Sequence, residues 1–274
     1  MKTSEPMIVV VLITATFVSG VIVCGDELTN QAVVATMPGL IDNLYLNGSG
    51  GGERPPGEHS TPFGSVGANW GIPLTPPDGT ALGLQLGGSV KAREDDPELN
   101  LTFGGFARQF RTFQDQQGAA ALLFDYRRTA FHNDVWAVRP ILGTTISPQD
   151  ALGMEVVAGL DREHGEEAID EFVPFWTRDW SRQVATEFGL GYQFSSVDEA
   201  LLRARLAYGF TPNADIGFGG DMNTDGDYAL GVTVSYHFGG TGRHAMLDNI
   251  GGKGNELYTP FPDAGFPVLF HRSK

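Results

Sequence analysis

Charged residues stand at alternate positions in segments whose intervening positions are apolar. Glu187 alternates with Phe188 and Leu190, and Arg203 and Arg205 alternate with Leu202 and Leu206. A charge in such surroundings is costly unless it is paired or hydrated. The pattern therefore predicts either an ion-paired interior or a wet pore whose charges select solutes. The candidate lumen-lining residues are Lys91, Arg93, Asp125, Arg127, Arg139, Glu155, Asp161, Glu187, Arg203 and Arg205.

The segment 221–227 carries the front half of a calcium-binding loop. Asp221, Asn223 and Asp225 are spaced so that their oxygens could face one hard cation. The distal bidentate glutamate is missing, because Val232 occupies its position. The alternative is an acidic hairpin turn with Asp-Gly at its tip, which we favour. We expect no metal centre and no cofactor, and keep these three residues as a weak calcium candidate.

The sequence offers little support for an enzyme. It contains neither Gly-x-Ser-x-Gly nor His-Glu-x-x-His, the motifs that place a nucleophile or a metal beside a base. His132 with Asp134, and His164 with Glu163, could form acid–base pairs in turns on one side of the molecule. Polar turn residues are the simpler interpretation. We predict that the protein is not an enzyme, with a membrane-embedded hydrolase as an alternative.

The elements that must position these residues are β-strands. In 227–238, Tyr228, Leu230, Val232, Val234, Tyr236 and Phe238 share one face, and small or polar residues share the other. This period of two predicts a strand with one apolar face, and the terminal aromatics are typical of a strand that crosses a bilayer. The aromatic residues expected at the membrane interfaces are Trp70, Trp136, Tyr126, Tyr192, Tyr208, Tyr228 and Tyr236.

Similar alternation recurs between short turns and gives eleven candidate strands from Phe63 to Phe238. Bacterial single-chain barrels have an even number of strands, so one more is needed, and 39–47 is the upstream candidate, followed by a loop over 48–62. We expect an all-β, antiparallel, up-and-down transmembrane barrel of about 12 strands, with 10 as the alternative. Gly104 and Gly105 predict a bulge, because the apolar residues change face there.

The expected topology collects the acidic turns at one rim. The 274 residues carry a net charge of -15, which argues against a nucleic-acid partner. The acidic rim could bind divalent cations collectively, or favour cationic solutes by electrostatic focusing.

The chain ends differ from the strand region. Residues 1–25 resemble a cleaved signal peptide, with a membrane helix as the alternative. Residues 26–38 are expected to be a linker, and 39–238 the barrel. Residues 239–274 are rich in glycine, proline and scattered aromatics, and either stay disordered or fold back as a plug. Cys24 is the only cysteine, so no internal disulfide can form.

The export signal, the repeated strands and the aromatic-terminated strand at 228–238 resemble a bacterial outer-membrane β-barrel protein. The segments 67–74 (GANWGIPL) and 81–87 (ALGLQLG) are similar to a family of secreted barrel proteins of unassigned function. The resemblance implies an outer-membrane location and a lipid partner, and it carries over no catalytic residue. One departure is the long tail after Phe238, where barrels of this kind often end.

The function expected from these features is porin-like passive diffusion of small solutes, or a purely structural role as a wall protein. A surface adhesin is the main alternative, although the turns are short for large recognition loops. A soluble β-sandwich is the further alternative, because it would also show strands of period two.

Overall fold

A computed structural model shows how the strands are arranged. It describes residues 43–54, 59–75, 80–93, 97–112, 116–128, 134–159, 170–194 and 198–238. The expected signal peptide, linker and C-terminal tail lie outside these ranges, as does Asp161. In the described ranges no helix is long and apolar enough to cross a membrane.

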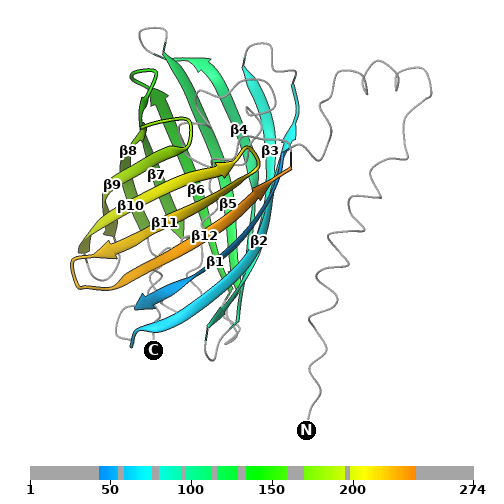
Figure 1. The fold of residues 1–274 in the computed structure, drawn as a ribbon. Helices are drawn as coiled ribbons and strands as arrows, with labels where there is room; N and C mark the ends of the chain where they lie inside the picture. Colours follow the sequence, from blue (N-terminus) through cyan, green and yellow to red (C-terminus); the bar gives the residue numbers. More distant parts are fainter. Residues whose placement is uncertain are drawn as a thin grey trace. The chain divides into compact units, whose positions relative to one another are not determined.

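The described residues form twelve antiparallel strands that close into one barrel, each strand paired with its neighbours in the sequence (Figure 1). The strands are β1 Leu44–Arg54, β2 Thr61–Pro73, β3 Ala81–Arg93, β4 Glu98–Arg111, β5 Gln117–Arg128, β6 Asp134–Thr145, β7 Asp150–Gly159, β8 Asp170–Asp179, β9 Val184–Phe194, β10 Asp198–Thr211, β11 Ala214–Asn223 and β12 Tyr228–His237. This confirms the prediction of an up-and-down barrel of about 12 strands, and it excludes the two-sheet sandwich.

The first and last strands close the ring. β1 pairs with β12 along its length, from Tyr45 opposite His237 to Arg54 opposite Tyr228. Closure leaves no strand edge with unpaired backbone groups, which is the condition for a sheet to survive in lipid. We call the rim where β1 begins and β12 ends the inner rim, and the opposite one the outer rim.

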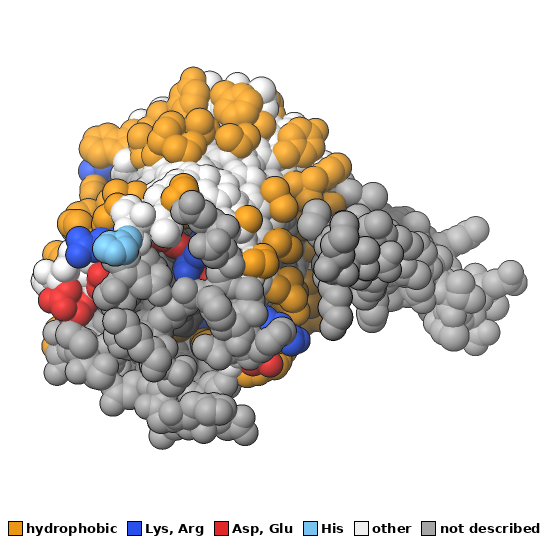
Figure 2. All heavy atoms as spheres, turned by 90° about the horizontal axis from the view of Figure 1, so that it is seen from below, with side chains coloured by type: hydrophobic (Ala, Val, Ile, Leu, Met, Phe, Trp, Pro, Cys, Tyr) orange, Lys and Arg blue, Asp and Glu red, His pale blue; other side chains and the backbone are white. Residues whose placement is uncertain are grey.

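Side chains alternate between the two sides of this wall. On β12, Leu230, Val232 and Val234 are exposed, whereas Ser235 and His237 on the other face are buried. Exposed leucine, valine and phenylalanine side chains recur on the outward face of the other strands, and hydrophobic side chains cover the outside of the ring (Figure 2). A surface this apolar is stable in a bilayer and not in water.

Aromatic residues occupy both ends of the outward face. Tyr236 and Trp70 lie near the inner rim, and Tyr126, Trp136 and Tyr192 lie near the outer rim. Tyr126 and Trp136 also pack against each other, with ring centroids 4.6 Å apart. Such rings suit the headgroup level, where one edge is apolar and the other is wet.

The upstream strand was predicted in the wrong place. β1 runs over Leu44–Arg54, so the glycine-rich stretch 48–54, expected to be loop, is strand. One of these glycines is required by close packing: a Cβ on Gly51 would collide with the backbone of Leu230 and would lie 2.7 Å from the Cα of Gly231. A glycine run therefore forms the seam that closes the barrel against β12.

The bulge predicted at Gly104 and Gly105 is also wrong. The register of β4 with β5 continues without interruption through both glycines, and it shifts between Arg108 and Phe110 instead. Gln109 there has a φ of 58°, in the left-handed region. The apolar residues change face because Phe106 points into the barrel, not because the strand is bulged.

Pro140 and Pro174 both lie inside strands, on the outward face. The pairing of β6 with β7 is interrupted between Val138 and Ile141, a gap that contains Pro140. That of β8 with β9 skips Pro174, between Phe172 and Phe175. Proline lacks the N–H that a ladder hydrogen bond needs, so each ring interrupts one ladder locally. The continuous pairing on the other side of each strand keeps it in the wall.

Candidate functional site: the barrel lumen

The charged side chains of the lumen point inward because alternate residues of a β-strand face the same side of the sheet. The described residues of the predicted lumen-lining set carry their side chains on the inward-facing series of the wall, and most are buried. Their contacts form two groups, which we call the outer cluster and the central belt.

The outer cluster lies where β1, β3, β4 and β5 reach the outer rim. Glu53 forms ion pairs with both Lys91 and Arg93. Arg93 reaches Glu98 at 3.1 Å, and Arg127 lies 3.9 Å from the same carboxylate. Three cations thus surround two carboxylates, so the cluster is largely neutralised internally.

The central belt is organised around Arg203 on β10. Its Nη1 donates to Glu155 at 2.7 Å, and its Nε donates to Asp221 at 3.0 Å. Glu171 lies 4.0 Å from its Nη2. The side chain of Arg203 is 2 % exposed, so these ion pairs form away from bulk water. A charge so enclosed is stable only with such partners.

Arg203 reaches across the inside of the wall. Glu155 lies on β7, which is separated from β10 by β8 and β9. Gly189 on β9 stands opposite Arg203 and carries no side chain, and a Cβ built there would be 3.4 Å from the Cβ of Arg203. The glycine therefore leaves room for the guanidinium to extend over β9 toward β7.

The belt continues from Glu155 toward β4. Arg139 lies 3.5 Å from Glu155 and donates to both oxygens of Asp125, at 2.8 and 3.1 Å. Thr102 donates a further hydrogen bond to Asp125 at 2.6 Å. Arg205 pairs with Glu187 at 3.3 Å beside the belt. The arrangement braces one side of the wall, from β4 to β11, with charge-assisted hydrogen bonds.

The remaining side of the lumen has a different lining. At mid-height, the inward residues of β11, β12, β1, β2 and β3 are small or uncharged and are partly exposed. They are Asn47, Ser49, Gly51, Ser65, Gly67, Gly87, Ser89, Gly217, Gly219, Gly231 and Thr233. We call this the small-residue wall. It offers hydroxyl and amide groups that are partly exposed.

Sequence reasoning missed several partners of these charges. Glu53, Glu98 and Glu171 were not proposed, and Asp221 was considered only as a calcium ligand. Glu98 and Asp221 could have been found by continuing the alternation to the strand ends. Which residues meet across the lumen, as Glu155 and Arg203 do, depends on barrel closure and is not visible in local spacing.

The weak calcium candidate is not assembled as a cation site. Asp221 binds Arg203, and the Nδ2 of Asn223 donates to Asp227 at 3.1 Å. Among the described residues, no group of three or more histidine, cysteine, aspartate or glutamate side chains could hold a metal ion.

Of the hydrolase candidates, His132, His164 and Glu163 lie outside the described ranges. Asp134 accepts a hydrogen bond from Tyr126 at 2.9 Å.

Comparisons with known proteins bear on the fold. No protein-family model matches the chain, and no curated protein matches it. The KdgM porin structure aligns with a TM-score of 0.52 at 9 % identity, covering 71 % of this chain and 99 % of that one. A structure of KdgM porin in complex with disordered oligogalacturonate gives 0.51, with the same identity and coverage. The NanC porin gives 0.47 at 8 % identity, covering 71 % and 98 %.

The closed ring, the apolar outer face and the inward polar residues together define an outer-membrane β-barrel. The likeness to KdgM porin shows a shared fold at this low identity. The barrel belongs in the outer membrane of a bacterium, where sheets of this kind span the bilayer.

Proposed function

We propose that the protein is a passive diffusion channel for small hydrophilic solutes. The observation that carries the proposal is the small-residue wall. A barrel that served only as a brace would gain stability from larger interior side chains, whereas this one keeps small polar side chains partly exposed on β1, β2, β3 and β12, and room for a Cβ at Gly217 on β11. Two similar structures with a TM-score above 0.5 are both of KdgM porin, which agrees with this function.

The charges add a selectivity argument. Most lumenal cations are paired with carboxylates, so the field along the solute path is weak compared with that of unpaired charges. We therefore expect uncharged polar solutes to pass well, and ion selectivity to be modest. A purely structural role would also be served by the ion-paired central belt. It differs from the channel in that it needs no open path through the barrel. No observation favours an adhesin or a hydrolase.

The test is conductance of the full chain in planar bilayers, with a matched pair of variants on β2. Ser65 faces the small-residue wall, and its neighbour Val66 faces lipid and is 66 % exposed. We expect Ser65→Trp to lower the single-channel conductance, by about twofold or more, because the indole fills the path. Val66→Trp should leave it unchanged.

A folded, heat-modifiable protein that never produces discrete conductance steps would contradict the channel. Equal conductance in both variants would show that the solute path does not follow the small-residue wall.

A further inference from the structure

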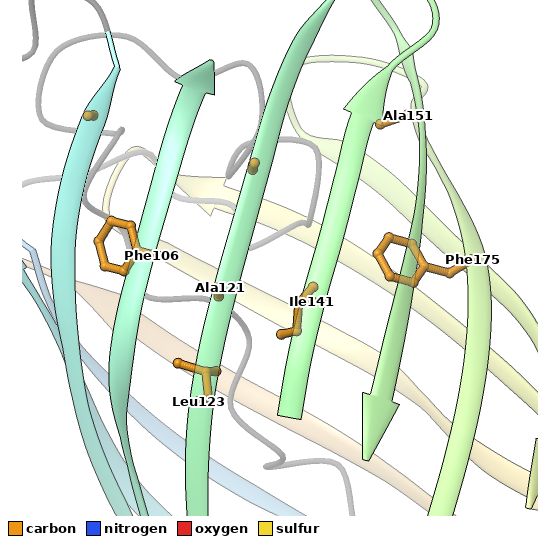
Figure 3. Close-up of a cluster of buried hydrophobic side chains, with 8 residues drawn as sticks. Phe106, Ala121, Leu123, Ile141, Ala151 and Phe175 are labelled. Carbon is orange, nitrogen blue, oxygen red and sulfur yellow. The ribbon is translucent and has the colours of Figure 1, made fainter. Parts of the chain in front are cut away.

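The lumen contains an apolar surface that a water-filled channel does not need. Eight inward side chains form one buried cluster on β3 to β8 (Figure 3). We call it the lumenal apolar patch, and its members are Ala81, Phe106, Ala119, Ala121, Leu123, Ile141, Ala151 and Phe175. Barrels of this kind usually have a polar interior. The patch therefore requires an explanation of its own.

The patch lies toward the inner rim. Ala81 is the first residue of β3, and Ala151 is the second residue of β7. Two aromatic rings lie against the wall beside glycines: a Cβ built on Gly83 would collide with the ring of Phe106, and one on Gly153 with that of Phe175. The rings thus widen a continuous apolar face on the inside of the wall.

These side chains are enclosed although they face an interior. Leu123 is 0 % exposed, Ile141 1 % and Phe175 4 %. Side chains so little exposed make almost no contact with lumenal water. An apolar side chain is most stable when another apolar group covers it, so we expect an apolar partner on the lumenal side of the patch.

We propose that the partner is the C-terminal segment of the same chain, residues 239–274, which docks on the lumenal apolar patch inside the barrel. The last strand, β12, ends at the inner rim, where the backbone N–H of Phe238 bonds to the carbonyl of Leu44. The segment that follows starts at the rim nearest the patch. An extended chain covers about 3.3–3.6 Å per residue, so a few residues suffice to reach the patch.

The composition of the segment fits this surface. Phe261, Phe266, Leu269 and Phe270 stand within ten positions, interspersed with Pro260, Pro262 and Pro267. The prolines disfavour a further strand, and the closed barrel has no free edge to receive one. Residues 26–42, which precede β1 in the sequence, contain no aromatic residue and match the patch less well.

The docking itself does not depend on the proposed channel function, because it concerns which surface covers the patch. It can therefore be measured by chemical access to the patch, without any transport assay.

The experiment uses the full chain in vesicles, with Cys24→Ser as background. Ala121→Cys reports on the patch, and Ser89→Cys on the small-residue wall serves as the matched lumenal control. Each cysteine variant is labelled with a small water-soluble maleimide in two versions of the chain. One has the intact tail, and the other carries Phe261→Asp, Phe266→Asp and Phe270→Asp together. We expect Ala121→Cys to react about tenfold faster or more once the tail is altered, because an aspartate disfavours apolar docking. The reactivity of Ser89→Cys should change much less.

Two results would overturn the proposal. Rapid labelling of Ala121→Cys with the intact tail would show that nothing covers the patch. Slow labelling of Ala121→Cys with the intact tail and with the altered tail alike would show that another segment covers the patch. Failure of the channel function would appear separately, as absent conductance in a chain whose labelling still responds to the tail.

Discussion

Arg203 is the side chain on which the central belt depends. It joins Glu155 on β7 to Asp221 on β11, with Glu171 of β8 nearby. Removing it leaves buried carboxylates without their main cation, which costs more than the net value of the pairs themselves. Arg205, two residues away, is 18 % exposed, and its pair with Glu187 lies closer to water.

We expect Arg203→Met to lower the free energy of unfolding by about 3–5 kcal/mol, because carboxylates are left buried and unpaired. Arg205→Met is the matched control and should cost on the order of 1–2 kcal/mol, since water can reach the site. Urea unfolding of the detergent-refolded protein, followed by tryptophan fluorescence, measures both. Equal losses would contradict the central role of Arg203.

The inward facing of most of these charges could be predicted from the alternation of apolar and polar positions. Their partners could not, because two carboxylates at similar strand positions meet different arginines depending on how far adjacent strands are shifted. Glu155 illustrates this, since it contacts Arg139 on the adjacent strand and Arg203 three strands away.

At the scale of the strand, β1 and β12 form the seam that turns a sheet into a ring. The close approach of their backbones at Gly51 and Leu230 requires a residue without a Cβ. The neighbouring Gly50 is less constrained, because a Cβ there would meet only the carbonyl oxygen of Phe63, at 3.6 Å.

The seam predicts different outcomes for two alanine variants. Gly51→Ala should destabilise the barrel by about 2 kcal/mol or more, because the added methyl forces the strands apart. Gly50→Ala should change stability by about 0.5 kcal/mol or less. The fraction that migrates as folded barrel on an unboiled gel, measured along a temperature series, gives the comparison. A seam that tolerates both alanines equally would rule out the close packing at Gly51.

Most strands could be predicted because a one-sided apolar face leaves a clear period of two. β1 was misplaced for a physical reason: a run of small residues carries no hydrophobic period, and it resembles a flexible loop until its packing partner is known. The bulge at Gln109 was missed for a similar reason, since the inward turn of Phe106 produced the signal expected of a bulge at Gly104.

At the scale of the whole molecule, one closed wall has an outer surface and an interior of different composition. The outer surface is apolar around the ring, and the interior combines a braced ion-pair belt, a small-residue wall and an apolar patch. The number of strands and the sidedness of the wall could be predicted from parity and alternation. The apolar patch could not, because its eight members are spread over six strands, and which of them meet depends on the register between adjacent strands.

The most direct test of this account is a spin-label scan along β12, residues 228–237, in lipid vesicles, with access to oxygen and to a water-soluble nickel chelate measured at each position. Labels at Leu230, Val232 and Val234 should favour oxygen, and labels at Gly231 and Thr233 should favour the chelate, with a period of two. Protection of both faces from both reagents, as in a sheet buried between protein layers, would contradict the membrane barrel.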